Sequence, residues 1–155
     1  MIMTAKAPAA GTDAMDHPRR ITPASFRPYG KVIGYPGKGQ KGTRRNLWRI
    51  ILTEHAQTGW RIAYLVVRDK RIRRLEAHPG TYESFEPVRG RSLLFVTKHK
   101  EGPVRCFLLD QPIILNKNIW HGVVTITPET EIKITENAKV ACRYWPLKSP
   151  LPANA

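Results

Sequence analysis

Cysteine, acidic residues and long apolar runs are all scarce in this sequence, and each shortage excludes a class of protein. The two cysteines, Cys106 and Cys142, stand far apart and form no CxxC pair. They exclude a framework of several disulfides, and we expect reduced, buried thiols in a cytoplasmic protein. No apolar run reaches the roughly 18 residues of a membrane-spanning helix, and Met1 to Arg20 lacks the apolar stretch of a signal peptide. No nucleophile elbow, P-loop or dinucleotide-binding fingerprint is present.

Basic residues, by contrast, are abundant: 26 Lys and Arg stand against 12 Asp and Glu, which gives a net charge of +14. They concentrate between Arg27 and Arg49, where no acid occurs, and between Arg61 and Arg74, where Asp69 is the single acid. Such a charge attracts nucleic acid, acidic membranes or small anions, or it merely keeps a surface solvated. No nucleic-acid reading motif and no interleaved aromatic residues accompany it. We therefore expect a small anionic substrate, no membrane, and at most weak, non-specific nucleic-acid binding.

A chain of 155 residues suits a single domain. Residues 1–18, rich in Ala, Pro, Gly and Asp, are expected to form a flexible tail, residues 19–148 the domain, and residues 149–155 a C-terminal tail. Thr22 followed by Pro23 predicts the N-cap and first position of a short helix. The segment 38–43, rich in glycine and lysine, predicts a loop.

The rest of the domain has the pattern of strands. Short β-branched and apolar runs are punctuated by glycine, proline and asparagine, with no alternation of helix and strand. The expected strands cover residues 32–33, 47–53, 61–68, 71–78, 92–97, 104–109, 113–115, 119–126, 131–135 and 139–145. Many short strands separated by turn signals indicate an all-β sandwich or barrel.

The residues best suited to chemistry lie just before and after residue 80. Glu76 and His78 flank one residue, so on a strand both side chains point to the same face. Glu83 follows shortly afterwards, and His121 lies in another apolar, strand-like run. Two imidazoles and two carboxylates carried by strands form the kind of set that binds a divalent metal through nitrogen and oxygen. The alternative is that Glu76 and His78 are ordinary half-exposed strand residues.

The spacing from Glu76 to Gly90, Glu-x-His-x4-Glu-x6-Gly, resembles the first motif of the cupin superfamily, with Glu76 in place of its first histidine. The second cupin motif, Pro-x-Gly-x-x-His, falls on residues 116–121, where His121 alone matches. The resemblance implies a cupin-type antiparallel β-barrel, also called a double-stranded β-helix, with a short N-terminal helix. In such a barrel inward-pointing side chains hold a metal.

A narrower resemblance is to the ureidoglycolate lyase family, and it covers roughly residues 21–124. It is carried by Leu75-Glu76-Ala77-His78-Pro79 with Phe85, Pro87 and Gly90, by Asn118-Ile119-Trp120-His121, by Arg105 with Phe107, and more weakly by the opening from Ile21 to Ile33. Members of that family are cupin-fold enzymes that split ureidoglycolate into glyoxylate and urea in purine degradation. The resemblance therefore implies a carbon–nitrogen lyase.

The resemblance also implies roles for individual residues. His78, Glu83 and His121 would be ligands of a divalent Mn, Fe, Ni or Zn ion, with Glu76 as fourth ligand or catalytic base. Lys117, where the family usually has arginine, would join Glu76 and Glu83 as a catalytic residue. Contacts with the substrate are expected from six residues: Tyr82, Phe85, Arg105, Asn116, Lys117 and Trp120. We also expect a homodimer.

The sequence departs from the family pattern at four positions. Ala77 stands where the family commonly has arginine, Glu83 where it has glutamine, and Asn116 and Gly122 where it has histidines. Glu83 brings the site closer to a general cupin metal site. The loss of an arginine and two histidines predicts a pocket stripped of groups that recognise the ureido substrate.

Two further functions therefore stay open beside the ureidoglycolate lyase reaction. One is a metal-dependent cupin enzyme that acts as a lyase or isomerase on a different small hydroxy or keto acid, including a biosynthetic one. The other is a basic barrel that binds a ligand or nucleic acid without chemistry. Metal content separates the second function from the third, and glyoxylate release identifies the first.

Overall fold

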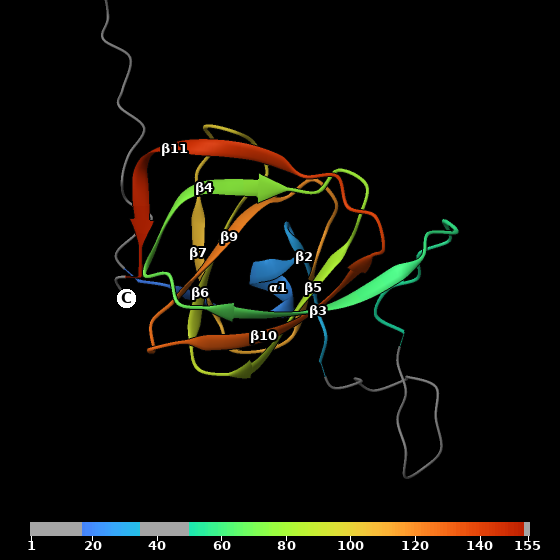
Figure 1. Cartoon of the computed structure of the whole chain (residues 1–155), viewed down its shortest axis with the longest axis horizontal. Helices are drawn as coiled ribbons and strands as arrows, with labels where there is room; N and C mark the ends of the chain where they lie inside the picture. Colours follow the sequence, from blue (N-terminus) through green and yellow to red (C-terminus); the bar gives the residue numbers. More distant parts are fainter. Residues whose placement is uncertain (1–16, 35–49, 154–155) are drawn as a thin grey trace, which may run out of the picture.

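Two β-sheets packed face to face build the fold (Figure 1). The computed structural model describes residues 17–34 and 50–153. One sheet has six strands in the order β1-β7-β6-β9-β4-β11, and the other has five in the order β2-β8-β5-β10-β3. Neighbouring strands are antiparallel except for the parallel pair β1–β7. This architecture, with one short helix among the residues just given, confirms the all-β, cupin-type fold class predicted from the sequence.

The elements have the following bounds. The six-stranded sheet contains β1 (Arg19–Arg20), β4 (Arg71–Ala77), β6 (Ser92–Thr97), β7 (Arg105–Leu109), β9 (Trp120–Thr125) and β11 (Arg143–Pro152). The five-stranded sheet contains β2 (Gly30–Val32), β3 (Trp60–Val67), β5 (Glu83–Arg89), β8 (Ile113–Leu115) and β10 (Thr130–Asn137). The helix is α1 (Pro23–Phe26).

Helix α1 begins where the sequence predicts it. Thr22 is its N-cap: the Thr22 side-chain oxygen accepts a hydrogen bond from the Ser25 N–H, and Ser25 Oγ accepts one from the Thr22 N–H, both at 3.0 Å. Pro23 occupies the first turn, where no intrahelical N–H is needed. Phe26 is buried, with its ring 5.4 Å from that of Phe107, and this contact anchors the helix on the core. No helix in the described part of the chain is long and apolar enough to cross a membrane.

Three segments differ from the sequence prediction. Strand β5 is not predicted, because Pro87 interrupts its pattern; the proline lies beside a register shift against β10, where a missing N–H is tolerated. Residues 50–53, the described part of the strand expected at 47–53, form no strand. Strand β11 starts later than expected and continues to Pro152, so residues 149–152, expected in a tail, belong to the sheet. The loop expected at 38–43 and residues 1–16 of the expected tail lie outside the described residues.

Apolar side chains form two clusters, one on each face of the six-stranded sheet. Along β6, Leu94 and Val96 point into the cluster between the sheets, whereas Leu93 and Phe95 point into the other cluster. This alternation follows from the two-residue period of a strand. The second cluster is covered by residues in and just after β11: Trp145, Leu147, Leu151 and Ala153. We call the first the inner cluster and the second the outer cluster.

Three connections between the sheets meet at one end of the barrel: β3–β4, β5–β6 and β9–β10. The Thr125 N–H donates to the Asp69 carbonyl at 3.0 Å, and the Ile126 N–H donates to the Arg91 carbonyl at 2.9 Å. Gly90 has φ +80°, and a Cβ there would lie 2.3 Å from the Glu129 carbonyl oxygen. Only glycine fits this close approach in the left-handed region. The glycine of the sequence motif therefore serves the crossing between sheets.

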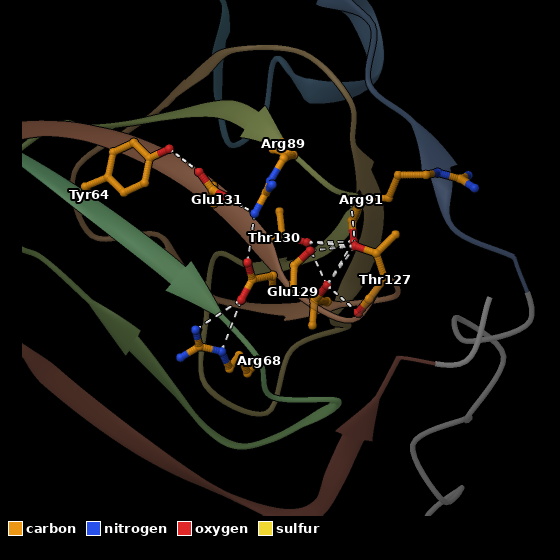
Figure 2. A network of polar contacts seen from close by, with 9 residues as sticks. Tyr64, Arg68, Arg89, Arg91, Thr127, Glu129, Thr130 and Glu131 are labelled. Atoms are coloured by element: carbon orange, nitrogen blue, oxygen red, sulfur yellow. Dashed lines mark hydrogen bonds and ion pairs between the residues drawn. The ribbon is translucent and has the colours of Figure 1, made fainter.

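Figure 2 shows the polar network that fastens these connections. Thr130 Oγ1 donates to the Arg91 carbonyl at 2.9 Å. Glu129 lies between two arginines, 3.1 Å from Arg68 and 2.9 Å from Arg89. The ion pairs join the end of β3 to β5 and to the connection before β10, and they fix the position of Arg68 at the barrel's rim.

Candidate metal centre and its cavity

Strands from both sheets bring the candidate ligands together. Glu76 on β4 is the direct register partner of His121 on β9. Glu83 is the first residue of β5 in the facing sheet. His78 follows the end of β4, where its carbonyl accepts a hydrogen bond from the Asn118 N–H at 2.8 Å. The packing of the two sheets thus gathers residues that are far apart in the sequence.

His78, Glu83 and His121 form a buried triad. Glu83 Oε2 lies 3.1 Å from His121 Nε2 and 3.3 Å from His78 Nε2. Despite these short separations, Glu83 Oε2 and His121 Nε2 have no hydrogen-bond partner, and buried polar atoms in that state cost free energy. Ligand atoms about 2.1 Å from one metal ion lie roughly 3.0–3.4 Å apart at octahedral to tetrahedral angles. The triad therefore fits a divalent metal ion.

The orientation of the His121 ring supports the same conclusion. His121 Nδ1 lies 2.9 Å from the Ile119 carbonyl oxygen. A carbonyl oxygen can only accept, so Nδ1 carries the hydrogen, and in the neutral ring the lone pair is on Nε2. Metal-binding histidines are commonly held in this way by a backbone carbonyl.

The triad also sets the charges of its members. Burial alone raises the pKa of Glu83, but the neighbouring His121 and His78 outweigh burial and lower that pKa to about 2. Burial alone lowers the pKa of His78, but the carboxylates of Glu83 and Glu76 outweigh it and raise that pKa. Glu83 is therefore an anion at neutral pH, as a metal ligand must be.

Glu76 lies beside the triad but is less enclosed. Its Oε1 is 3.8 Å from His121 Nε2, and its side chain is 40% exposed. Arg74 places its guanidinium 4.3 Å from the centre of the Tyr144 ring, and Tyr144 is the register partner of Glu76 on β11. Because it is half-exposed, Glu76 is accessible to a molecule that enters from solvent.

A cavity of about 750 Å³ lies between β3 and β4 and includes this site. Glu76, Glu83 and His121 are among its lining residues. Its apolar wall includes Phe85, Val123 and Ile134, and four arginines also line it: Arg68, Arg71, Arg73 and Arg74. A cavity with an apolar wall and several cations suits a small anionic ligand.

Of the residues expected to contact substrate, Phe85 lines this cavity, with its ring 5.6 Å from that of His121 in an edge-on arrangement. Trp120 points to the opposite face of the sheet, where it packs in the outer cluster with its ring 6.0 Å from that of Trp145. Adjacent strand residues face opposite ways, so the position of His121 in the cavity places Trp120 outside it.

Lys117 lies 2.5 Å from Glu54 and over the Tyr82 ring, with Nζ 4.9 Å from the ring centre. Lys117 and Tyr82 thus contact each other, and neither is part of the cavity lining just described. Asn116 and Arg105, which also lie in the described part of the chain, do not line this cavity either. Substrate contacts by these four residues stay predictions.

The four cavity arginines are the functional candidates that sequence analysis does not single out. Their signal is the basic run from Arg61 to Arg74, which predicts an attraction for anions. The turn between β3 and β4 determines which arginines of this run line the cavity. No spacing rule in the sequence predicts the geometry of that turn.

Two of the departures from the family pattern, Ala77 and Gly122, differ in how they lie relative to the cavity. Ala77 is fully buried in the outer cluster. A side chain at Gly122 would point at Ile72 and Leu75, because its Cβ would lie 2.5 Å and 3.2 Å from their side-chain ends. Ala77 therefore has no side chain at the pocket, whereas Gly122 lines the cavity through its backbone. That these positions strip the pocket of recognition groups stays a prediction. Of the four departures, Glu83 is the one whose side chain enters the triad.

Cys142 also differs from expectation. Cys106 is buried as predicted, but Cys142 is exposed, because β11 begins one residue later and leaves it in the preceding loop. Both thiols are free. Burial raises the pKa of Cys106 to about 11, which keeps it as an inert thiol.

The two-sheet barrel and its buried triad define a cupin-like protein with a candidate metal centre. The ureidoglycolate lyase of Rhizobium etli strain CIAT 652 is 30% identical over an alignment of 119 positions, which covers 66% of this chain and 72% of that protein. The ureidoglycolate lyase of Mesorhizobium japonicum is 30% identical over an alignment of 125 positions, which covers 69% of this chain and 76% of that protein. The chain belongs to the ureidoglycolate lyase family.

Solved structures of Bacillus subtilis oxalate decarboxylase, among them the protein at pH 4.6, also match with 20% identity and a TM-score of 0.45. The match covers 58% of this chain, which spans about a quarter (24%) of the decarboxylase chain. No protein-family model matches the sequence.

Proposed function

We propose that this protein is a metal-dependent carbon–nitrogen lyase that cleaves ureidoglycolate, or a close 2-hydroxy-acid analogue, to glyoxylate and urea. The observation that carries the proposal is the buried triad with its unpartnered ligand atoms. Membership of the ureidoglycolate lyase family supports the reaction class. His78, Glu83 and His121 would hold the ion, which when bound would make the substrate hydroxyl more acidic.

The chain's own residues have distinct tasks in this proposal. The arginines of the cavity bind and orient the substrate carboxylate, and the apolar wall with Phe85 limits water at the reacting carbon. Glu76 is the general base, because it is the half-exposed carboxylate next to the triad. The neighbouring His121 and His78 keep Glu83 an anion despite its burial, so it does not compete for the proton.

The proton path is balanced within one turnover. Glu76 accepts the hydroxyl proton while the hydroxyl oxygen forms the aldehyde carbonyl and the carbon–nitrogen bond breaks. The electron pair of that bond goes to the ureido nitrogen. Glu76 then returns its proton to this nitrogen, which leaves as urea. Glu76 ends as the carboxylate with which it began.

The test combines metal analysis with a glyoxylate assay on purified variants. Glu76→Gln should retain most of the metal and lose roughly 100-fold or more in turnover, the usual size of a general-base contribution. Glu83→Gln should keep the fold but bind metal more weakly, because it removes an anionic ligand. Glu86→Gln is the matched control, since Glu86 pairs with Lys133 and does not line the cavity.

Full glyoxylate release by metal-stripped wild-type protein would contradict the metal's role. Glu76→Gln with unchanged turnover would remove Glu76 as the base. A fully metal-loaded wild type that releases no glyoxylate from ureidoglycolate would reject this substrate.

A second candidate function is cleavage or isomerisation of a different small hydroxy or keto acid. Its support is the cavity, which at about 750 Å³ is at the upper range of ligand sites and offers four arginines. Competition against ureidoglycolate by a series of hydroxy and keto acids would rank the two candidates. Tighter binding and turnover of a larger acid would favour the second.

Two expectations about the whole molecule remain predictions. A homodimer is checked by sedimentation of the purified full chain. A non-catalytic role in binding ligand or nucleic acid is checked by a salt titration with DNA or RNA, in which affinity should be weak and fall steeply with salt.

A further inference from the structure

A second set of metal-type ligands lies next to the triad. Glu76, His78 and Cys142 each offer one ligand atom, and these atoms lie within 4.8 Å of one another. A carboxylate, an imidazole and a thiol are the three side-chain types that bind zinc-like ions. The set shares His78 with the triad but contains a sulfur ligand, which the triad lacks.

The two ring nitrogens of His78 have different surroundings. His78 Nε2 faces Glu83 in the triad at 3.3 Å. His78 Nδ1 is buried and has no hydrogen-bond partner. The backbone of Ala141, the residue before Cys142, faces the His78 ring without making a well-formed hydrogen bond to it. An unpartnered nitrogen on a buried ring, beside the segment that carries a thiol, is what a metal site without its ion would present.

The side chain of Cys142 is directed toward this set. Its Sγ lies within 4.8 Å of a ligand atom of Glu76 and of His78. Cys142 directly precedes β11, in which Tyr144 is the register partner of Glu76 on β4. Cys142 is also exposed and free, which gives an ion access from solvent.

We propose that Cys142, His78 and Glu76 form a second cation site, selective for thiophilic divalent ions such as Zn²⁺ or Cd²⁺. On binding, the thiol loses its proton to solvent and a metal–sulfur bond forms, with no change in oxidation state. Binding there engages Glu76, so occupancy inhibits turnover if Glu76 is the base. This consequence rests on the proposed function, whereas the site itself does not.

The test is a Cd²⁺ titration of the full-length protein, followed by the ultraviolet absorption of the cadmium–thiolate bond. Wild type and Cys106→Ala should show this absorption, and Cys142→Ser should lose it. Cys106→Ala is the matched control, because it removes the buried thiol and leaves the exposed one. In parallel, saturating Cd²⁺ should slow alkylation of Cys142 by iodoacetamide at least tenfold.

Equal absorption in Cys142→Ser, or an alkylation rate that Cd²⁺ does not change, would overturn the proposal. His121→Ala separates this site from the triad: the absorption should persist when the triad has lost a ligand. Loss of the absorption in folded His121→Ala would mean that Cys142 only joins the triad's ion, and it would also overturn the second site. The metal content of Cys142→Ser tests the proposed function independently, since the triad is intact in that variant.

Discussion

The two faces of the β4–β9 strand pair are made by adjacent residues and have opposite characters. Glu76 and His121 point into the cavity, where buried polar atoms lack partners. Their neighbours Leu75 and Trp120 point into the outer cluster, which is apolar and covered by β11. The unpartnered polar atoms of the inner face therefore lower the stability of the fold, and apolar burial on the outer face raises it. Substitutions on one face at a time should therefore separate effects on metal binding from effects on the free energy of unfolding.

The largest effect is expected for binding at the inner face. His121→Ala removes one of the three proposed metal ligands. Since the loss of a supporting contact to a ligand already costs 10–100-fold, metal affinity should fall by roughly 100-fold or more. Isothermal titration with Mn²⁺ or Zn²⁺ measures this. In the presence of a chelator, the free energy of unfolding should change little. A large loss of stability with affinity intact would reverse the roles assigned to the two faces.

The counterpart on the outer face is Trp120→Ala, one residue away. It leaves a large cavity between Leu75 and Trp145, and we expect a loss of about 3–5 kcal/mol in the free energy of unfolding. Denaturant unfolding measures the loss. The folded fraction should still bind one metal ion at the triad. Trp120→Phe, which fills most of the space, is the milder variant should the alanine variant fail to fold.

The pH dependence of the free energy of unfolding should also reflect the inner face, because the triad there contains two groups with shifted pKa values, Glu83 and His78. The lowered pKa of Glu83 contributes stability above its ordinary value of 4.5, and this is lost as pH falls through about 2. The raised pKa of His78 contributes stability below its ordinary value of 6.5, and this is lost as pH rises through the folded-state value. Chelated protein should therefore be most stable between about pH 4.5 and 6.5.

Metal-loaded protein should show the opposite trend at the basic end, since the ion needs a neutral His78. Its stability should rise above pH 6.5, where that of the chelated protein falls. Thermal unfolding of both forms across this range decides the matter. Parallel curves for the two forms would show that His78 is not a ligand.

The smallest effect is expected for Gly122→Ala on the outer face. The added Cβ would lie 2.5 Å from the end of the Ile72 side chain, which is flexible and can rotate away. We expect a loss of about 1 kcal/mol in the free energy of unfolding and unchanged metal affinity. A tenfold loss of affinity would show that the two faces are coupled through β9.

Local patterns in the sequence are sufficient to predict much of this site. The alternation of a strand places Glu76 and His78, and the family-like spacing adds Glu83 and His121, so the triad could be predicted. The cap of α1 was equally readable, because Thr22 and Pro23 act within one turn. The same alternation places Trp120 on the face opposite His121, so its direction was also readable from the sequence once His121 was taken as a ligand.

The arginines and Cys142, by contrast, could not be placed from the sequence. Their positions depend on where strands start and on how β3 crosses to β4, and a shift of one residue turns a side chain to the other face. Strand β5 was missed because Pro87 disrupts its pattern at a register shift that is visible in the paired strands alone.

The late position of β11 in the chain has a consequence for how the protein folds as it is made. The strand pairs with β4, which precedes it by about half of the domain, so their contacts are among the more non-local of the fold. Until the ribosome has released β11, the nascent chain presents Leu75, Trp120 and their neighbours as an uncovered apolar surface. Such a surface is the usual binding site of chaperones. The docking of this strand should therefore be the step that removes the exposed apolar surface.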